Sequence, residues 1–177
     1  TPGTILYDVK TDFGGYSPQN ADRKFRGNIT VRSAISQSLN IPSVEVMQYL
    51  AVDRSVEALK RFGLTTISNK TDYGLSLALG SAEAKLTEMT NAYATLADEG
   101  KHHDLTTITQ IKDKFEKQIY SAGNSKPREV VDESAAFLIS DILNDESARA
   151  PIFGSSLNTN GYDVAVKTGT TDEARDA

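Results

Sequence analysis

Five consecutive residues near the end of the sequence bring together an ammonium, hydroxyls and a glycine: Lys167, Thr168, Gly169, Thr170 and Thr171. A lysine beside hydroxyls suits a substrate carboxylate, and the glycine lets a substrate backbone lie against the strand that we expect here. The backbone N–H of Thr170 can face an oxyanion. Taken alone, this Lys-Thr-Gly run fits one wall of an active site and a solvated strand end equally well.

A second polar group, Ser38-Leu39-Asn40, stands far upstream and just before Pro42. We expect it at the C-terminus of a helix, where Ser38 and Asn40 can project into one cleft. There the asparagine can orient a substrate amide, and the serine hydroxyl can relay a proton between its neighbours. Alone, the triplet fits better as a polar helix end before a proline, so only the two motifs together indicate a site.

The elements that must position these motifs are mainly helices in the first half of the chain. Thr30 is expected to be the N-cap of a helix that ends near Asn40, because Pro42 disfavours helical geometry at the residue before it. A second helix is expected to begin at Pro42. Asp53 should cap a third helix, which ends beside Gly63.

Helices and strands are both predicted further along the chain. Thr87 should cap a helix that Gly100 closes, and Asp132 should cap another one. Apolar and polar residues alternate over 105–111 and 115–120, which predicts a β-hairpin between these two helices.

Three stretches carry many turn signals and are predicted to be mainly loop: residues 1–28, 65–86 and 145–161. The alternation that follows predicts a strand over 162–168, which would deliver Lys167 to the site. Together these elements predict an α/β (α+β) chain that is rich in helices in its first half.

The composition limits the possible functions. The 177 residues are 38% hydrophobic, enough for the core of one domain, and the net charge of −5 argues against a nucleic-acid binder. Cysteine is absent, which excludes disulfides, a thiol nucleophile and thiolate metal ligands. The two histidines, His102 and His103, are adjacent and are predicted to be solvated loop residues. Phosphate-loop, dinucleotide and zinc-protease motifs are absent from the sequence.

The two polar motifs, with the sequence around them, resemble the transpeptidase domain of class A penicillin-binding proteins. The Ser-x-Asn and Lys-Thr-Gly elements appear in the order that the family shows. Nearly the whole chain takes part in the resemblance, through residues 16–20, 27–34, 37–42, 77–81, 91–97 and 167–171.

One family motif is missing from these residues. The nucleophile of the family is the serine of a Ser-x-x-Lys motif upstream of Ser-x-Asn, and no such motif occurs in this sequence. Thr109 and Lys112 have the same spacing, but they follow Ser-x-Asn and lie in the predicted hairpin. We therefore expect residues 1–177 to be a partial transpeptidase domain, truncated at both ends.

The resemblance implies a fold and a set of roles. The fold would be the serine β-lactamase/DD-transpeptidase-like one, a largely antiparallel sheet with helices on both faces. Ser38 would relay a proton to the leaving group, Asn40 would hold the substrate amide, and Lys167 would supply positive potential. Thr168 and Thr170 would hydrogen-bond the substrate carboxylate, and the Thr170 N–H would form half of an oxyanion hole. No metal or organic cofactor is implied.

The implied activity is peptidoglycan DD-transpeptidation through an acyl-serine intermediate. The partners would be stem peptides ending in D-Ala-D-Ala and β-lactam antibiotics, with no nucleic acid. The parent protein would act on the outer face of the bacterial cytoplasmic membrane, through an anchor outside this chain. Two alternatives stay open: a DD-carboxypeptidase or β-lactamase relative, and a catalytically dead peptide-binding or scaffold domain.

Overall fold

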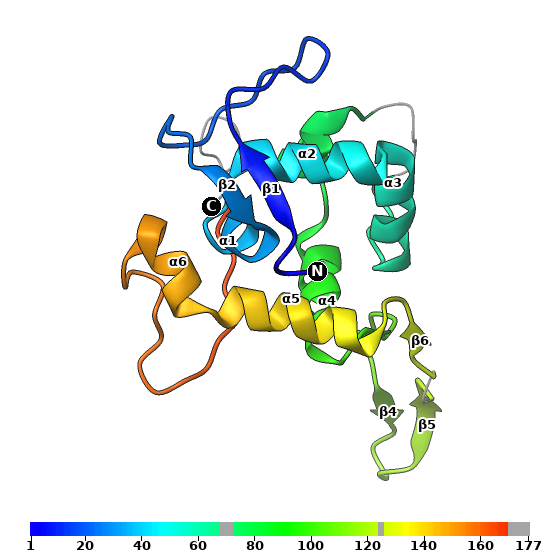
Figure 1. The fold of residues 1–177 in the computed structure, drawn as a ribbon. Helices are drawn as coiled ribbons and strands as arrows, with labels where there is room; N and C mark the ends of the chain where they lie inside the picture. Colours follow the sequence, from blue (N-terminus) through cyan, green and yellow to red (C-terminus); the bar gives the residue numbers. More distant parts are fainter. Residues whose placement is uncertain (68–72, 124–125, 170–177) are drawn as a thin grey trace.

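The computed structural model describes residues 1–67, 73–123 and 126–169. The short helix α1 (Val31–Ser36) lies between two longer ones, α2 (Asn40–Leu50) and α5 (Glu133–Asn144), as Figure 1 shows. Strands β1 (Ile5–Asp8) and β2 (Gly27–Thr30) pair antiparallel beside α1, with Leu6 opposite Ile29. The fully buried side chains of Ile41, Val44 and Ile142 belong to α2 and α5.

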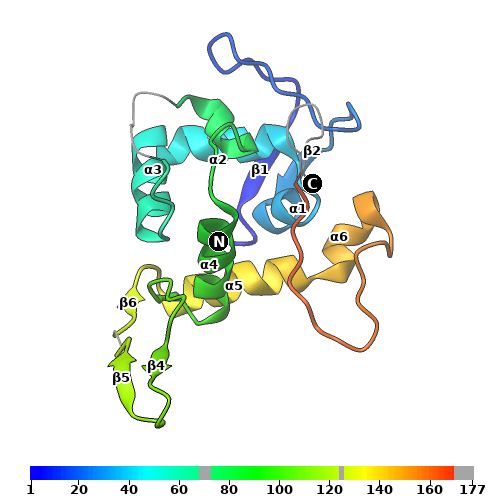
Figure 2. The same cartoon turned by 180° about the vertical axis from the view of Figure 1, so that it is seen from behind.

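A second group of elements packs at one end of α2. It comprises α3 (Val52–Arg61), the 3₁₀ helix η2 (Leu75–Leu79) and α4 (Leu86–Ala97). They enclose an apolar core made of Val56, Leu64, Ile67, Leu77 and Ala92. Helix α6 (Glu146–Phe153) follows α5 at the opposite end of the molecule (Figure 2).

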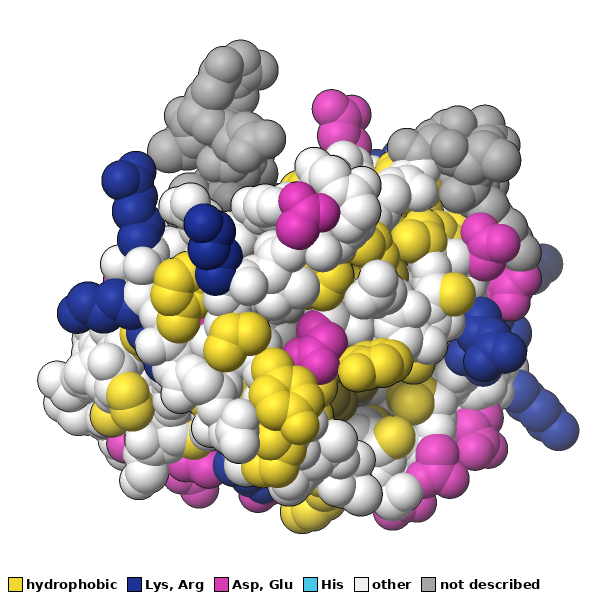
Figure 3. All heavy atoms as spheres, turned by 45° about the horizontal axis from the view of Figure 1, so that its top comes forward, with side chains coloured by type: hydrophobic (Ala, Val, Ile, Leu, Met, Phe, Trp, Pro, Cys, Tyr) yellow, Lys and Arg dark blue, Asp and Glu magenta, His cyan; other side chains and the backbone are white. Residues whose placement is uncertain are grey.

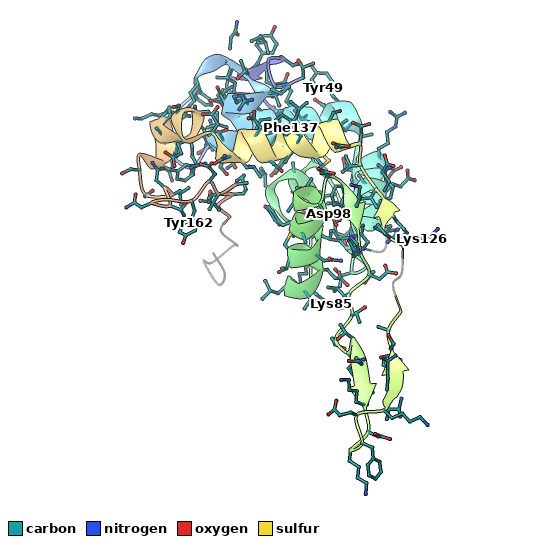
Figure 4. The ribbon with its side chains drawn as sticks, turned by 90° about the horizontal axis from the view of Figure 1, so that it is seen from below. Tyr49, Lys85, Asp98, Lys126, Phe137 and Tyr162 are labelled. Carbon is teal, nitrogen blue, oxygen red and sulfur yellow. The ribbon has the colours of Figure 1, made fainter. Side chains whose placement is uncertain are left out.

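Two further pairs of strands are antiparallel. Strand β3 (Lys101–His102) pairs with β6 (Arg128–Glu129) close to α4. Strands β4 (Gln110–Lys112) and β5 (Gln118–Ser121) form a hairpin that extends away from the helices, as Figure 4 shows. The described part of the chain is therefore α+β with antiparallel strands, which confirms the predicted fold class.

The surface mixes charges of both signs with hydrophobic side chains, as the face in Figure 3 shows. Between β1, α2 and α5 lies a mainly apolar hollow of about 480 Å³, which Ile5, Tyr49 and Leu138 help to line. In the described ranges, no helix combines the length and the apolar character that crossing a membrane requires.

Several local predictions are confirmed. Thr30 caps α1 by accepting a hydrogen bond from the Ser33 N–H, and Asp132 caps α5 by accepting one from the Ser134 N–H. The hairpin around Asp113 is present as predicted. Each of these features depends on residues close together in sequence, so the local pattern was sufficient.

Other local predictions are wrong. Residues 145–161 contain α6, whose N-cap is Asp145. Helix α4 begins at Leu86 after Lys85, so Thr87 lies in its first turn instead of capping it. The third helix begins at Val52 after Ala51, so Asp53 lies in its first turn instead of capping it. Pro42 lies in the first turn of α2, where its missing N–H costs no helical hydrogen bond.

His102 is buried, contrary to the prediction of a solvated loop residue. Its side chain is 4% exposed, and its Nδ1 lies 3.0 Å from the Thr95 hydroxyl. That hydroxyl already donates to the Asn91 carbonyl, so the Nδ1 of His102 is the donor in this bond. Burial lowers the pKa of His102 below its ordinary value. His103 is exposed, as predicted, and contacts Asp98.

Candidate active site

Ser38 occupies a backbone position that usually belongs to glycine. Its N–H donates to the Ile35 carbonyl, and the Leu39 N–H donates to the Ala34 carbonyl, which together close helix α1 in a Schellman motif. The residue between the helix and Leu39 must then be left-handed, and Ser38 has φ +55°. A side chain in this conformation carries a steric cost, which is often found at functional positions.

Asn40 lies at the start of α2 and not at the end of the preceding helix. The predicted position of the triplet is therefore right for Ser38, in the turn that ends α1, and wrong for Asn40. Helix α1 ends at Ser36, a left-handed turn follows at Ser38, and α2 begins at Asn40. The Nδ2 of Asn40 donates to the Gln19 carbonyl at 2.7 Å. Among the described residues its Oδ1 accepts no hydrogen bond, which leaves an amide oxygen available for a ligand.

Lys167 meets Ser38 although the two are far apart in sequence. The Nζ of Lys167 donates to the Ser38 hydroxyl at 2.6 Å and to the Thr168 carbonyl at 2.8 Å. The structure therefore brings together the two motifs that the sequence singled out. Burial of the ammonium lowers the pKa of Lys167, even though part of the side chain stays exposed to solvent.

The segment that carries Lys167 is not the predicted strand. Residues 163–169 run past α1 without regular secondary structure, as Figures 1 and 2 show. A single backbone hydrogen bond joins this segment to another element among the described residues, from the Val166 N–H to the Leu143 carbonyl at 3.0 Å. The same carbonyl accepts a bond from Arg149 Nη1 at 2.7 Å, so α5, α6 and this segment are joined through one oxygen.

Two other residues of the Lys-Thr-Gly run, Thr168 and Gly169, lie among the described residues. Thr168 is half-buried, and a Cβ at Gly169 would meet no described residue within 4 Å. The described residues therefore leave room for a ligand beside Gly169. Thr170 and Thr171 lie outside the described residues.

The hydroxyl of Ser38, the ammonium of Lys167 and the amide of Asn40 are groups of the kinds that can relay a proton and bind an amide. A lysine with a lowered pKa that donates to a hydroxyl can exchange a proton through it. In the described ranges no group of three His, Asp or Glu side chains could hold a metal ion.

Sequence reasoning missed one buried residue of this site, Asn20. Its side-chain oxygen accepts from the backbone N–H of Asn40 at 2.9 Å. The only signal was indirect, because Asn20 lies in a segment of the family resemblance, but no local pattern linked it to Asn40.

Comparison with known proteins identifies relatives along the whole chain. A family model described as the penicillin binding protein transpeptidase domain matches residues 3–177. Penicillin-binding protein 1C of Escherichia coli is 33% identical over 177 residues, covering 99% of this chain and 21% of the relative. Penicillin-binding protein 1A of Rickettsia felis is 31% identical over 183 residues, covering 91% of this chain and 22% of the relative. The chain thus spans about a fifth of the length of these relatives.

A solved structure shows the same fold. Penicillin-binding protein A of M. tuberculosis, described as an imipenem acyl-enzyme complex, matches with a TM-score of 0.79 at 16% identity, covering 98% of this chain and 44% of that one. The family match, the relatives and the contact between the two motifs lead to one conclusion: the chain belongs to the transpeptidase domain family of the class A penicillin-binding proteins.

Proposed function

We propose that this chain forms part of the active site of a peptidoglycan DD-transpeptidase. The observation that carries the proposal is the 2.6 Å hydrogen bond between Lys167 Nζ and Ser38 Oγ, which unites two motifs 129 positions apart. If each motif had only a local structural role, no hydrogen bond between them would be expected. The reaction replaces the terminal D-Ala of one stem peptide by an amine of a neighbouring one, through an acyl-serine intermediate.

Three described residues have distinct roles in this reaction. Ser38 passes a proton to the leaving amine, and Lys167 both orients that hydroxyl and supplies positive potential to the substrate carboxylate. Asn40 receives the substrate amide at its Oδ1, which accepts no hydrogen bond within the described ranges. Thr168 and Thr170 hydrogen-bond the carboxylate, Gly169 and Thr171 line the same wall, and the Thr170 N–H completes half of the oxyanion hole.

The nucleophile belongs to a part of the protein that is not among these 177 residues. No Ser-x-x-Lys motif occurs in them, so the chain alone lacks the group that is acylated. Removing the nucleophile of a serine enzyme lowers the rate about a millionfold. The chain by itself is therefore expected to be inactive and to bind substrate weakly.

The parent enzyme takes stem peptides ending in D-Ala-D-Ala as substrates and β-lactams as inhibitors. The acyl-enzyme described for the M. tuberculosis relative supports the second expectation. Since peptidoglycan is assembled outside the cytoplasm, the enzyme works on the outer face of the bacterial cytoplasmic membrane.

The test is the intact mass of the protein after incubation with benzylpenicillin. It is run on the 177-residue chain and on a longer chain that includes the residues before and after it in the same protein. We expect one adduct on the longer chain and none on the shorter one. The Lys167→Met variant of the longer chain should be acylated far more slowly.

Absence of an adduct on a folded longer chain would overturn the enzymatic proposal and favour a scaffold domain. If an adduct forms, a stem-peptide substrate with and without an acceptor amine separates a transpeptidase from a carboxypeptidase. Release of D-Ala without cross-linked product would assign the carboxypeptidase reaction instead.

A further inference from the structure

Helix α2, which carries Asn40 at its first position, has no cap of its own. The residue at its N-cap is Leu39, whose side chain cannot accept a hydrogen bond. Leu39 is also 2% exposed. The first backbone N–H groups of α2 would be left without partners unless another segment supplied an acceptor.

Asn20 supplies that acceptor from 20 positions away. Its Oδ1 accepts from the Asn40 N–H at 2.9 Å and lies 3.4 Å from the Ile41 nitrogen. Asn20 is 3% exposed, so water does not compete for these bonds. An asparagine oxygen is among the best acceptors for the N–H groups of a helix start.

The orientation of the Asn20 amide is fixed from the other side. Its Nδ2 donates to Asp8 Oδ1 at 2.7 Å and to the Lys24 carbonyl at 2.8 Å. A flipped amide would turn its oxygen towards these two acceptors and its NH₂ towards the N–H groups of α2. Every contact would then become repulsive, so only one orientation fits.

Asp8 is itself held in place. It lies on β1 with 0% of its surface exposed, and its Oδ2 accepts from the Arg26 N–H at 3.0 Å. The Arg26 guanidinium, 3.6 Å away, balances its charge. A buried carboxylate with these partners is a rigid support for the amide that it contacts.

We propose that Asn20, oriented by Asp8, is a positioning residue that fixes Asn40 in the active site. The chain of bonds runs from Asp8 through the Asn20 amide to the backbone of Asn40, while the Gln19 carbonyl holds the Asn40 side chain. Together these contacts determine where the Oδ1 of Asn40 points. This inference rests on the proposed function, because it assigns Asn20 to the same reaction.

The experiment measures the acylation rate of the longer chain by benzylpenicillin in four variants. Asn20→Ala removes the acceptor, and Asn20→Asp keeps the acceptor but sets two carboxylates against each other. The double variant Asp8→Asn/Asn20→Asp exchanges the two side chains and restores a hydrogen bond between these positions. The control, Asp132→Ala, removes a helix cap of α5 that does not touch the site.

We expect Asn20→Ala to slow acylation about ten- to a hundredfold, because a small displacement of a catalytic group has effects of this size. Asn20→Asp should also be slow, and the exchanged pair should recover much of the rate. Asp132→Ala should acylate at the wild-type rate at a temperature where every variant is folded. Equal rates for Asn20→Ala and Asp132→Ala would overturn the proposal. If Asn20→Ala does not fold, the Asn20→Asp and exchanged variants decide in its place.

A second readout does not depend on catalysis. Hydrogen exchange of the Asn40 amide in the 177-residue chain should accelerate in Asn20→Ala and stay unchanged in Asp132→Ala. Unchanged exchange in Asn20→Ala would also overturn the proposal. A wild-type longer chain that is not acylated at all would refute the proposed function, and the exchange result would still decide the role of Asn20.

Discussion

The ammonium of Lys167 donates a hydrogen bond to the Ser38 hydroxyl at 2.6 Å, and Ser38 holds its hydroxyl there from a left-handed turn. The turn is enforced by the Schellman motif that ends α1, and the lysine is carried by a segment joined to the end of α5. The contact therefore depends on how α1 and α5 pack, which the hydrogen bond from the Ser36 hydroxyl to the Ile142 carbonyl fixes at 2.9 Å.

Replacing Ser38 by glycine should have opposite effects on stability and on activity. Glycine adopts φ near +55° without steric cost, and we expect a gain of about 0.5–1 kcal/mol in the free energy of unfolding. The hydroxyl that Lys167 contacts is lost, so acylation of the longer chain should fall. Thermal unfolding and intact mass measure the two effects. Ser38→Ala is the matched control, since it loses the hydroxyl but keeps a Cβ, and a stability gain in that variant would contradict the explanation.

The lowered pKa of Lys167 predicts how stability depends on pH. Between the lowered pKa of the folded state and the ordinary value of 10.5, the unfolded chain binds more protons than the folded one. The free energy of unfolding should therefore rise with pH in that window and fall as the pH drops through the folded pKa. Urea unfolding of the wild type and Lys167→Met across alkaline pH tests this. The same slope in both proteins would show that Lys167 is not the group responsible.

Glu88 joins α4 to the turn after α3 and should make the fold sensitive to acid. A hydrogen bond from the Thr65 hydroxyl, and then one from Lys85, lower the pKa of its carboxyl below the ordinary 4.5. The stability that these bonds provide is present above pH 4.5 and is lost as the pH falls through the folded pKa. Glu88→Gln should lower the melting temperature at pH 7 and flatten its acid dependence. Glu116→Gln, at an exposed ion pair of the hairpin, should leave the melting temperature nearly unchanged.

Gly63 should tolerate no side chain, because His102 lies against it. A Cβ at Gly63 would approach His102 Cε1 to 2.6 Å, and the backbone there has φ +88°. We expect Gly63→Ala to cost about 2–4 kcal/mol, through the strained backbone and the displaced imidazole. Gly14→Ala has the same backbone cost at φ +79°, but its Cβ would meet no atom of the described residues within 4 Å. Chemical denaturation of both variants isolates the contribution of the contact with His102. Equal losses of unfolding free energy in the two variants would contradict a cost from that contact.

The sequence predicted features whose causes are local. Thr30 and Asp132 cap helices through N–H groups a few residues away, and the hairpin around Asp113 depends on its own alternation. The start of α2 was not predictable in this way, because its acceptor, Asn20, comes from a distant loop. Leu39, the N-cap residue of α2, is not one of the residue types that indicate the start of a helix.

The candidate site was predicted as a pair of motifs, but not in its geometry. The structure brings Ser38 and Lys167 together, and their catalytic roles stay predictions. The strand expected over 162–168 requires a neighbouring strand to accept its hydrogen bonds. Within the described ranges, the one backbone partner from another element is the Leu143 carbonyl at the end of α5, so the alternating pattern does not produce a strand.

The β4–β5 hairpin makes the chain convenient to label. Its tip, around Phe115, extends away from the helices, and its backbone hydrogen bonds close within the hairpin itself (Figure 4). An inserted peptide tag or fluorophore would therefore disturb neither the Ser38–Lys167 contact nor the packing of α1 against α5. A reporter at this tip could follow the protein in living cells while the Ser38–Lys167 contact remains intact.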